Sequence, residues 1–224
     1  MQGYIENMRI DSSTFLVLDL DDTLYHEKDY QLSGFRAVAC YFQDLYGYDP
    51  YTELVRLSLC GETDVFGWLC RNSNLPMSCR ESLVWIYRNH APTIQLGSRV
   101  FETLGRLRNI LPGIAILTDG RSVTQRLKLQ SLGLSDVPAY ISEEYGDTKP
   151  GLLRFELIQK RHSADQYCYI GDNPAKDFFA PNALGWKTIG VKGSGDNVHP
   201  QDTVGLAEEY LPDVWINHFH EIWV

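Results

Sequence analysis

Cysteine, basic charge and long apolar runs are all scarce in this chain of 224 residues. Its five cysteines are an odd number and include no C-x-x-C pair, which argues against a zinc site or a disulfide framework. Lys and Arg number 20 against 29 Asp and Glu, and the net charge of −9 argues against nucleic acid as the main partner. A small phosphorylated substrate is not excluded, because one local site can be positive inside an acidic protein.

No apolar run approaches the roughly 18 residues that a membrane helix needs. The polar lead-in at residues 1–13 has neither the basic flank nor the apolar core of a secretory signal. Reduced, buried thiols are the simplest explanation of the cysteines. We therefore expect a cytoplasmic protein without a membrane partner, while its oligomeric state is not readable from the sequence.

One stretch dominates the sequence: the apolar run at residues 15–18 ends in three carboxylates within four positions, Asp19, Asp21 and Asp22. Such a run predicts a buried strand of a parallel sheet, and residues two apart on a strand point the same way. Asp19 and Asp21 would repel each other unless a cation lies between them or one is protonated. Asp19 could then supply a nucleophile and Asp21 a proton donor and acceptor. A strand followed by an acidic turn is the alternative explanation.

From residue 98 onward, predicted strands and helices alternate. The strands are expected at 114–117, 139–141, 167–170 and 187–191, with an edge strand at 214–216, and the helices at 100–107, 122–131, 152–161, 174–184 and 206–210. This alternation predicts βαβ units and a parallel sheet that is covered on both faces. The predicted fold class is therefore α/β, with a Rossmann-like core.

Residues 30–90 show helical periodicity without strand-like alternation, as in the apolar positions Phe35, Val38, Ala39 and Phe42. Four short helices are expected, the first of them ending at Gly47. The predicted organisation is an α/β core formed by residues 1–24 and 95–224. An all-helical cap at residues 25–94 is inserted directly after the first strand, over the strand ends.

Polar groups follow three of the predicted strands, and a lysine stands in the chain between the second and the third. Each group alone has a simpler explanation: Thr118 as a helix cap, Lys149 as a surface charge, Asp172 as a turn residue. Their common position at the carboxyl ends of strands is where open α/β sheets bind ligands. The groups are Asp19-Leu-Asp21-Asp-Thr23, Thr118-Asp119-Gly120, Lys149-Pro150 and Gly171-Asp172-Asn-Pro-Ala-Lys-Asp177.

Together these groups resemble the four motifs of the haloacid dehalogenase-like (HAD) hydrolase superfamily, most of whose members are phosphatases. D-x-D-x-T matches Asp19 to Thr23, the threonine motif matches Thr118, the lysine matches Lys149, and G-D-x(3–4)-D matches the segment from Gly171 to Asp177. About 95 residues separate the first two motifs and about 30 the next two. This spacing is similar to that of the subgroup with a helical cap between the first two motifs.

The resemblance implies a Mg²⁺-dependent phosphatase that hydrolyses a small phosphate monoester, a nucleoside monophosphate or a sugar phosphate, through an aspartyl-phosphate on Asp19. Mg²⁺ would be held by Asp19, Asp172 and the backbone carbonyl of Asp21. Asp21 would protonate the leaving group and later activate water. Thr118 and the N–H groups of Asp119 and Gly120 would hold the phosphoryl oxygens, Lys149 would neutralise phosphate charge, and Thr23 and Asp177 would support these groups from behind.

Two features bear on the chemistry that the resemblance implies. Asp119 stands where many relatives carry asparagine. The change is mild if only its backbone N–H is used, whereas an extra negative charge near phosphate would lower affinity or alter the optimum pH. Dehalogenases lack an aspartate equivalent to Asp21, since a halide needs no proton, so its presence favours phosphoryl transfer. Two alternatives stay open: a phosphomutase with the same motifs, and a catalytically idle protein that keeps the fold for binding or regulation.

Overall fold

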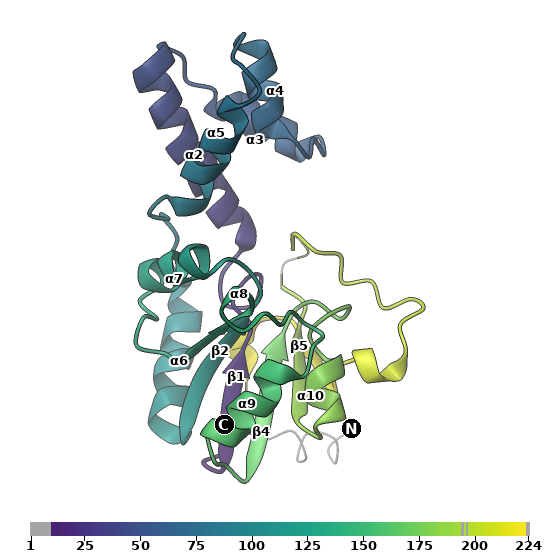
Figure 1. The fold of residues 1–224 in the computed structure, drawn as a ribbon. Coiled ribbons are helices and arrows are strands. Elements are labelled where there is room, and N and C mark those ends of the chain that lie inside the picture. The colour runs from purple at the N-terminus through teal and green to yellow at the C-terminus, as the bar shows by residue number, and fades with distance from the viewer. Residues whose placement is uncertain (1–9, 194, 196, 223–224) are drawn as a thin grey trace.

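The computed structural model describes residues 10–193, 195 and 197–222, so most of the expected lead-in at 1–13 lies outside it. Its centre is a six-stranded parallel sheet with the order β3-β2-β1-β4-β5-β6 (Figure 1). The strands are β1 Thr14–Leu18, β2 Gly113–Thr118, β3 Ala139–Ile141, β4 Gln166–Gly171, β5 Lys187–Val191 and β6 Val214–Ile216. The predicted α/β class and the predicted strands are confirmed.

Both faces of the sheet are buried, as β1 illustrates. Leu16 and Leu18 pack on the side that also holds Leu104 of α6 (Ser98–Ile110) and Leu129 of α7 (Ser122–Ser131). The intervening Phe15 and Val17 pack with residues of α9 (Leu153–Arg161) and α10 (Phe179–Ala183) on the opposite side. A strand covered on both sides is apolar at successive positions, which explains the unbroken run before Asp19.

A second group of helices comprises α2 Glu27–Tyr46, α3 Tyr51–Leu59, α4 Val65–Asn72 and α5 Cys79–Asn89, and we call it the helical block. In Figure 1 it stands apart from the sheet, connected through the lower end of α2 and the chain that follows α5. Its own apolar core includes Phe35, Phe42, Leu54 and Leu69. The expected number of four helices is correct, although α2, at 20 residues, is not short.

Two glycines shape the helical block. Gly47 ends α2 in the left-handed conformation, with φ of 73°, and its N–H donates to the carbonyl of Gln43. Gly34 lies in the middle of α2, where a β-carbon would come within 2.5 Å of the Tyr87 ring of α5. The missing side chain therefore lets the Tyr87 ring pack directly against the α2 backbone.

Three helical predictions differ from the structure. The helix expected at 174–184 is only α10, because Asp177 accepts the N–H of Asn173 at 2.7 Å and holds residues 173–177 in a turn. The helix expected at 206–210 is a single 3₁₀ turn, Glu208–Tyr210. A short helix, α8 at Ser142–Tyr145, was not predicted, since four residues carry no periodicity. Within the described residues, no helix has both the length and the apolar character needed to cross a membrane.

Candidate active site

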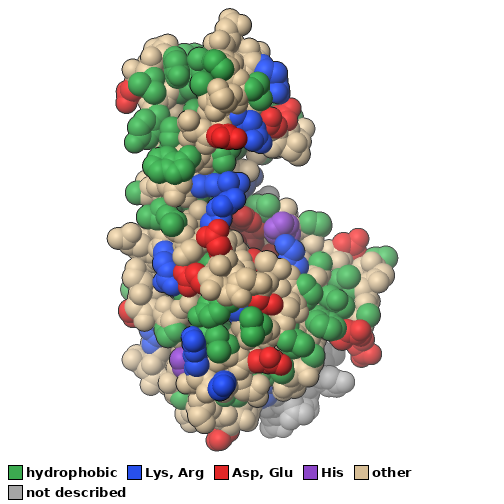
Figure 2. Space-filling model, viewed as in Figure 1, with side chains coloured by type: hydrophobic (Ala, Val, Ile, Leu, Met, Phe, Trp, Pro, Cys, Tyr) green, Lys and Arg blue, Asp and Glu red, His purple; other side chains and the backbone are tan. Residues whose placement is uncertain are grey.

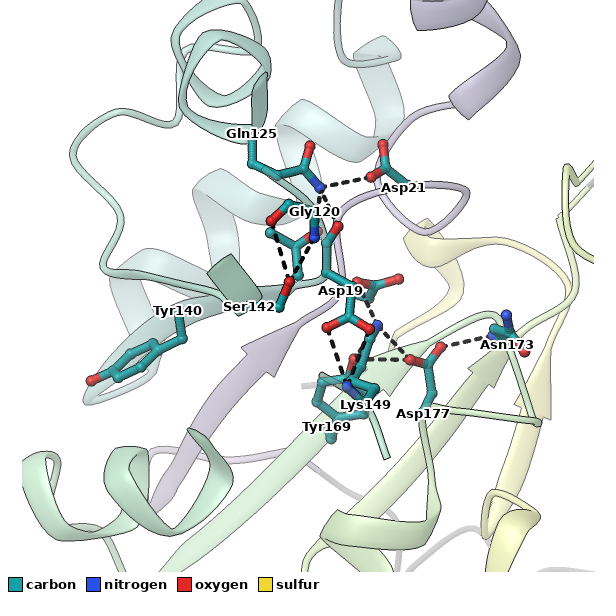
Figure 3. Close-up of polar contacts among 12 residues, drawn as sticks. Asp19, Asp21, Gly120, Gln125, Tyr140, Ser142, Lys149, Tyr169, Asn173 and Asp177 are labelled. Carbon is teal, nitrogen blue, oxygen red and sulfur yellow. Dashed lines mark hydrogen bonds and ion pairs between the residues drawn. The ribbon is translucent and has the colours of Figure 1, made fainter. Parts of the chain in front are cut away.

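Asp19, Lys149 and Asp177 form a buried cluster at the carboxyl end of the sheet (Figure 3). Lys149 Nζ lies 2.8 Å from Asp19 Oδ1 and 2.5 Å from Asp177 Oδ1. The hydroxyl of Tyr169, on β4, donates to Asp177 Oδ1 at 3.2 Å, and Lys149 Nζ donates to the same hydroxyl at 3.2 Å. Residues more than 120 positions apart in the chain therefore meet in one ion-pair network.

This cluster carries more negative than positive charge. Carboxylate oxygens of Asp19, Asp172 and Asp177 all lie within 4.8 Å of one another, with Lys149 as their cation. Burial raises the pKa of Asp19 well above its usual range, and it raises that of Asp172 to about 7. Burial opposes the charge of Lys149, but Asp177 and Asp19 outweigh this and raise its pKa. The arrangement therefore favours an additional cation.

Asp21 has a separate set of partners from Asp19. Its Oδ1 is 2.7 Å from Lys128 Nζ and accepts the hydroxyl of Tyr25, and its Oδ2 accepts Gln125 Nε2 at 3.0 Å. Burial alone would raise the pKa of Asp21, but Lys128 and Gln125 more than offset this and lower it. Neither partner was predicted from the sequence. The sequence nevertheless contains a signal for them, because Gln125 and Lys128 are three positions apart and therefore share one face of α7, which begins just after the second motif.

Asp119 is neutralised from behind by an arginine that the sequence analysis also missed. Arg154 is completely buried, and its Nη2 lies 2.6 Å from Asp119 Oδ1. The Asp119 carboxylate also accepts the N–H of Lys149 at 3.1 Å. Arg154 Nη1 donates to the carbonyls of Thr118 and Tyr140 as well. The extra charge that would disfavour phosphate is therefore paired, and it braces the loop after β2.

Thr118 and Gly120 differ in how their donors are used. Thr118 Oγ1 accepts Gln125 Nε2 at 2.7 Å, so its own hydrogen is available for another acceptor. The N–H of Gly120 donates to Ser142 Oγ at 2.9 Å, so holding a phosphoryl oxygen would require it to exchange this bond. The expected supporting residue Thr23 is buried, and its hydroxyl has no hydrogen-bond partner in the described part of the chain.

The loop after β5 also reaches the site, which the sequence analysis did not predict. Asn197 Nδ2 donates to Asp172 Oδ2 at 2.7 Å, and the N–H of Val198 donates to Asp22 Oδ2 at 2.7 Å. Asp22 Oδ1 accepts the first N–H of α2, that of Glu27, at 2.8 Å. Asp22 thus links this loop to the base of the helical block and adopts a left-handed φ of 53° to do so.

Two cavities meet beside these residues. The first, which we call the catalytic cavity, has a volume of about 230 Å³, and its lining includes Asp19, Asp21, Thr118, Lys149 and Asp172. The second, which we call the outer cavity, has about 270 Å³ and is lined by residues of α2, α5 and α7. Asp21, Glu27, Asp119 and Gly120 line both cavities.

Comparisons with solved structures identify the fold. The HAD-hydrolase YfnB from Bacillus subtilis, bound to magnesium, matches with a TM-score of 0.63 at 19% identity, over 93% of this chain and 96% of that one. A 2-haloacid dehalogenase from Pseudomonas syringae pv. Tomato matches with a TM-score of 0.61 at 20% identity, over 93% and 95%. The fold is that of the HAD-like hydrolases. The fold that the four motifs predict is thus confirmed.

The sequence comparisons are sparser. No family model matches the chain. A ribulose-1,5-bisphosphate 5-phosphatase from Halopiger xanaduensis is 30% identical over 125 residues, which is 54% of this chain and 52% of that protein. The chain thus spans about half the length of this curated relative. The curated relative is named a phosphatase and one of the solved structures a dehalogenase, so these names do not assign a reaction to this chain.

Proposed function

We propose that this protein is a Mg²⁺-dependent phosphatase that hydrolyses a small phosphate monoester through an aspartyl-phosphate on Asp19. The observation that carries the proposal is the grouping of a buried carboxylate, its lysine partner and a second carboxylate around one small cavity. Asp19, Lys149 and Asp172 line this cavity, with Asp21 at its junction with the outer cavity. The relative named as a sugar bisphosphate phosphatase supports a small phosphorylated substrate.

The residues present fit a magnesium ion. Asp19 and Asp172 each keep one carboxylate oxygen without a hydrogen-bond partner among the described residues, whereas both oxygens of Asp177 are taken by Lys149, Tyr169 and Asn173. Asp19 and Asp172 would therefore hold the ion, together with the backbone carbonyl of Asp21, and Asp177 would support Lys149. Hard oxygen ligands suit Mg²⁺, which when bound neutralises phosphate charge so that a carboxylate can approach phosphorus.

The chain's own residues divide the chemical steps. A carboxylate oxygen of Asp19 forms a bond to phosphorus while the bond from phosphorus to the alcohol oxygen breaks, and Asp21 gives its proton to that oxygen. Asp21 then removes a proton from water, whose oxygen attacks phosphorus and releases phosphate and free Asp19. Thr118 and Lys149 hold the phosphoryl oxygens throughout these steps.

Asp21 is the residue that favours a phosphatase over a dehalogenase. Asp21 borders both cavities. If the phosphoryl group of the substrate lies in the catalytic cavity, its ester oxygen would lie beside Asp21. An alkoxide needs a proton in order to leave, whereas a halide does not. Asp21 would have to take up this proton in the substrate complex, because Lys128 and Gln125 favour its ionised form in the free protein.

We propose further that residues 25–94, which contain the helical block, act as a cap on a core formed by residues 1–24 and 95–224. Tyr30 and Gln31 of α2 and Tyr87 and Arg88 of α5 line the outer cavity opposite residues of α7. The cap would exclude bulk water during phosphoryl transfer, and its side chains would select the alcohol part of the substrate. Sugar phosphates and nucleoside monophosphates are the candidate substrates.

The test is hydrolysis of p-nitrophenyl phosphate and a panel of sugar phosphates and nucleotides by the protein and by its Asp19→Asn variant. We expect Mg²⁺-dependent release of inorganic phosphate from the wild type, and a loss of at least about a thousandfold in the variant because the nucleophile is absent. The variant should keep the circular dichroism spectrum of the wild type. Activity that survives in Asp19→Asn would refute the nucleophile, and an isomerised sugar phosphate without released phosphate would indicate a mutase.

A further inference from the structure

The outer cavity contains a buried lysine that the proposed reaction does not use. Lys128 is 4% exposed, and its Nζ lies 2.7 Å from Asp21 Oδ1 and 4.3 Å from the centre of the Tyr30 ring. An ammonium group has three N–H donors, and Asp21 takes one of them. No other hydrogen-bond acceptor for Nζ is found in the part of the chain that the structure describes. A buried cation thus borders the cavity with donors left over.

Two arginines stand at the mouth of the same cavity. Arg88, near the end of α5, and Arg121, just before α7, line the outer cavity and also the adjoining surface hollow of about 510 Å³. The Arg88 guanidinium makes no ion pair or hydrogen bond within the described residues, and Arg121 lies 3.7 Å from Glu143. Figure 2 shows Lys and Arg side chains gathered at the junction between the helical block and the core.

The acidic residues of the outer cavity do not cancel these three cations. Asp119 is already paired with Arg154. Burial, together with Asp21 and Asp22, raises the pKa of Glu27 to about 7, so this group carries only part of a charge near neutral pH. Asp21, the partner of Lys128, is therefore the one carboxylate among the described lining residues that is fully charged and has no arginine partner, while Glu143 in the adjoining hollow offsets part of the charge of Arg121.

We propose that the outer cavity binds a second anionic group, a phosphate or a carboxylate, carried on the alcohol part of the substrate. Lys128 is the inner contact of this group, and Arg88 and Arg121 are the outer ones. The inference rests on the proposed function for its orientation, because the scissile phosphate must occupy the catalytic cavity. Charge-assisted hydrogen bonds are the strong ones in proteins, so one such contact is expected to change affinity about tenfold or more.

The kinetic test uses pairs of esters that differ in the second anion. Glycerol 3-phosphate and 3-phosphoglycerate differ by a carboxylate, and pentane-1,5-diol monophosphate and bisphosphate differ by a phosphate. We expect kcat/KM of the wild type to favour the anionic member of at least one pair by about tenfold or more, mainly through KM. Which pair shows the larger ratio tells whether the second group is a carboxylate or a phosphate.

Variants assign the preference to Lys128. Lys128→Met keeps the length of the side chain without its charge, and we expect the ratio within a pair to fall to about one. Because Lys128 also contacts Asp21, both esters are expected to lose rate, and the ratio cancels this shared loss. Lys128→Arg should keep most of the preference, Arg88→Met should reduce it in part, and Arg56→Met, an exposed arginine of α3 outside the cavity, should leave it unchanged.

Calorimetric binding to the Asp19→Asn protein separates failure of this inference from failure of the proposed function. If no ester is hydrolysed, yet 3-phosphoglycerate binds more tightly than glycerol 3-phosphate and loses this advantage in Asp19→Asn/Lys128→Met, the anion site stands and the phosphatase does not. A ratio near one in both wild-type pairs, or a preference that Lys128→Met retains, overturns the inference whether or not the protein is a phosphatase.

Discussion

The α/β core and the helical block bury different kinds of side chain. In the described part of the core, seven charged residues are buried: Asp19, Asp22, Lys128, Lys149, Arg154, Asp172 and Asp177. Among the described residues of helices α2–α5, the single buried polar side chain is Ser33. Its hydroxyl accepts the N–H of Thr93 at 2.8 Å and lies 2.9 Å from His90 Nε2, at the point where the chain returns to the core.

The charged residues of the helical block lie instead on its surface. Arg36 pairs with Asp49 and Arg56 with Glu53, each at a largely solvated position. Such surface pairs contribute between zero and about 1 kcal/mol. The block is therefore held together by apolar packing, whereas the core carries buried charges that form ion pairs or, for Asp22 and Asp172, accept hydrogen bonds. Substitutions in the two regions should therefore have different consequences.

The largest expected effect on stability is in the core. Arg154→Met would leave Asp119 without its cation and would remove donors from the carbonyls of Thr118 and Tyr140. Loss of one partner of a buried ion pair costs about 3–5 kcal/mol, and we expect that loss in the free energy of unfolding measured in urea. The matched control is Arg161→Met, an exposed arginine on the same helix, which should change stability by less than about 1 kcal/mol. Equal effects of the two substitutions would contradict the structural role of Arg154.

In the helical block, the expected loss of stability depends on the buried apolar volume that a substitution removes. Leu69→Ala removes a fully buried side chain of α4, and we expect a loss of about 3 kcal/mol from the lost burial and the remaining cavity. Leu59→Ala makes the same chemical change at a leucine of α3 that is 68% exposed, and it should have little effect on thermal unfolding. If Leu59→Ala were as damaging as Leu69→Ala, the packing described for the block would be wrong.

The smallest effect is expected at Glu27, where the two regions meet. Burial raises its pKa in the folded protein to about 7, helped by Asp21 and Asp22 and opposed by Lys128 and Lys176. Between about pH 4.5 and 7 the folded protein keeps a proton that the unfolded chain releases, so this group's contribution to stability falls as pH rises through that window.

Glu27→Gln does not titrate, so the comparison with wild type isolates this group. We expect the stability of the wild type relative to Glu27→Gln to fall by about 2.5 kcal/mol between pH 5 and pH 8, measured by urea unfolding at several pH values. Glu102→Gln, an exposed glutamate of α6, should show no such trend. A difference between wild type and Glu27→Gln that does not vary with pH would rule out a raised pKa at Glu27.

The sequence predicted the sheet and the grouping at its carboxyl edge because these depend on local patterns. The apolar run before Asp19 and the strands at 114–117 and 167–170 show the periodicity of buried strands, and parallel pairing places their ends together. The nearness of Asp19, Lys149 and Asp172 follows from that topology. Their roles in catalysis, and those of Thr118, Asp119 and Gly120, stay predictions.

The partners that sequence analysis missed depend on long-range packing. Arg154 and Asn197 look like ordinary polar residues of a helix or a loop, and nothing nearby in the sequence shows that they turn inward. Arg154 is recognisable only once Asp119 needs a counter-charge, and Asn197 only once the loop after β5 has folded over Asp172. The helix predicted at 174–184 begins too early, because the bond from the N–H of Asn173 to Asp177 holds residues 173–177 in a turn. The spacing of apolar residues does not reveal such a bond.

Helix α2 begins at the candidate active site and ends at the far side of the helical block (Figure 1). Glu27, its first residue, lines both cavities, and Asp22 holds the N–H of that residue at 2.8 Å. Twenty residues at about 1.5 Å each make a rod of about 30 Å. A tilt of about 10° at the lower end of such a rod sweeps its tip through about 5 Å. Because of its length, α2 would convert a small rotation near Asp21 into a larger displacement at the remote surface of the helical block.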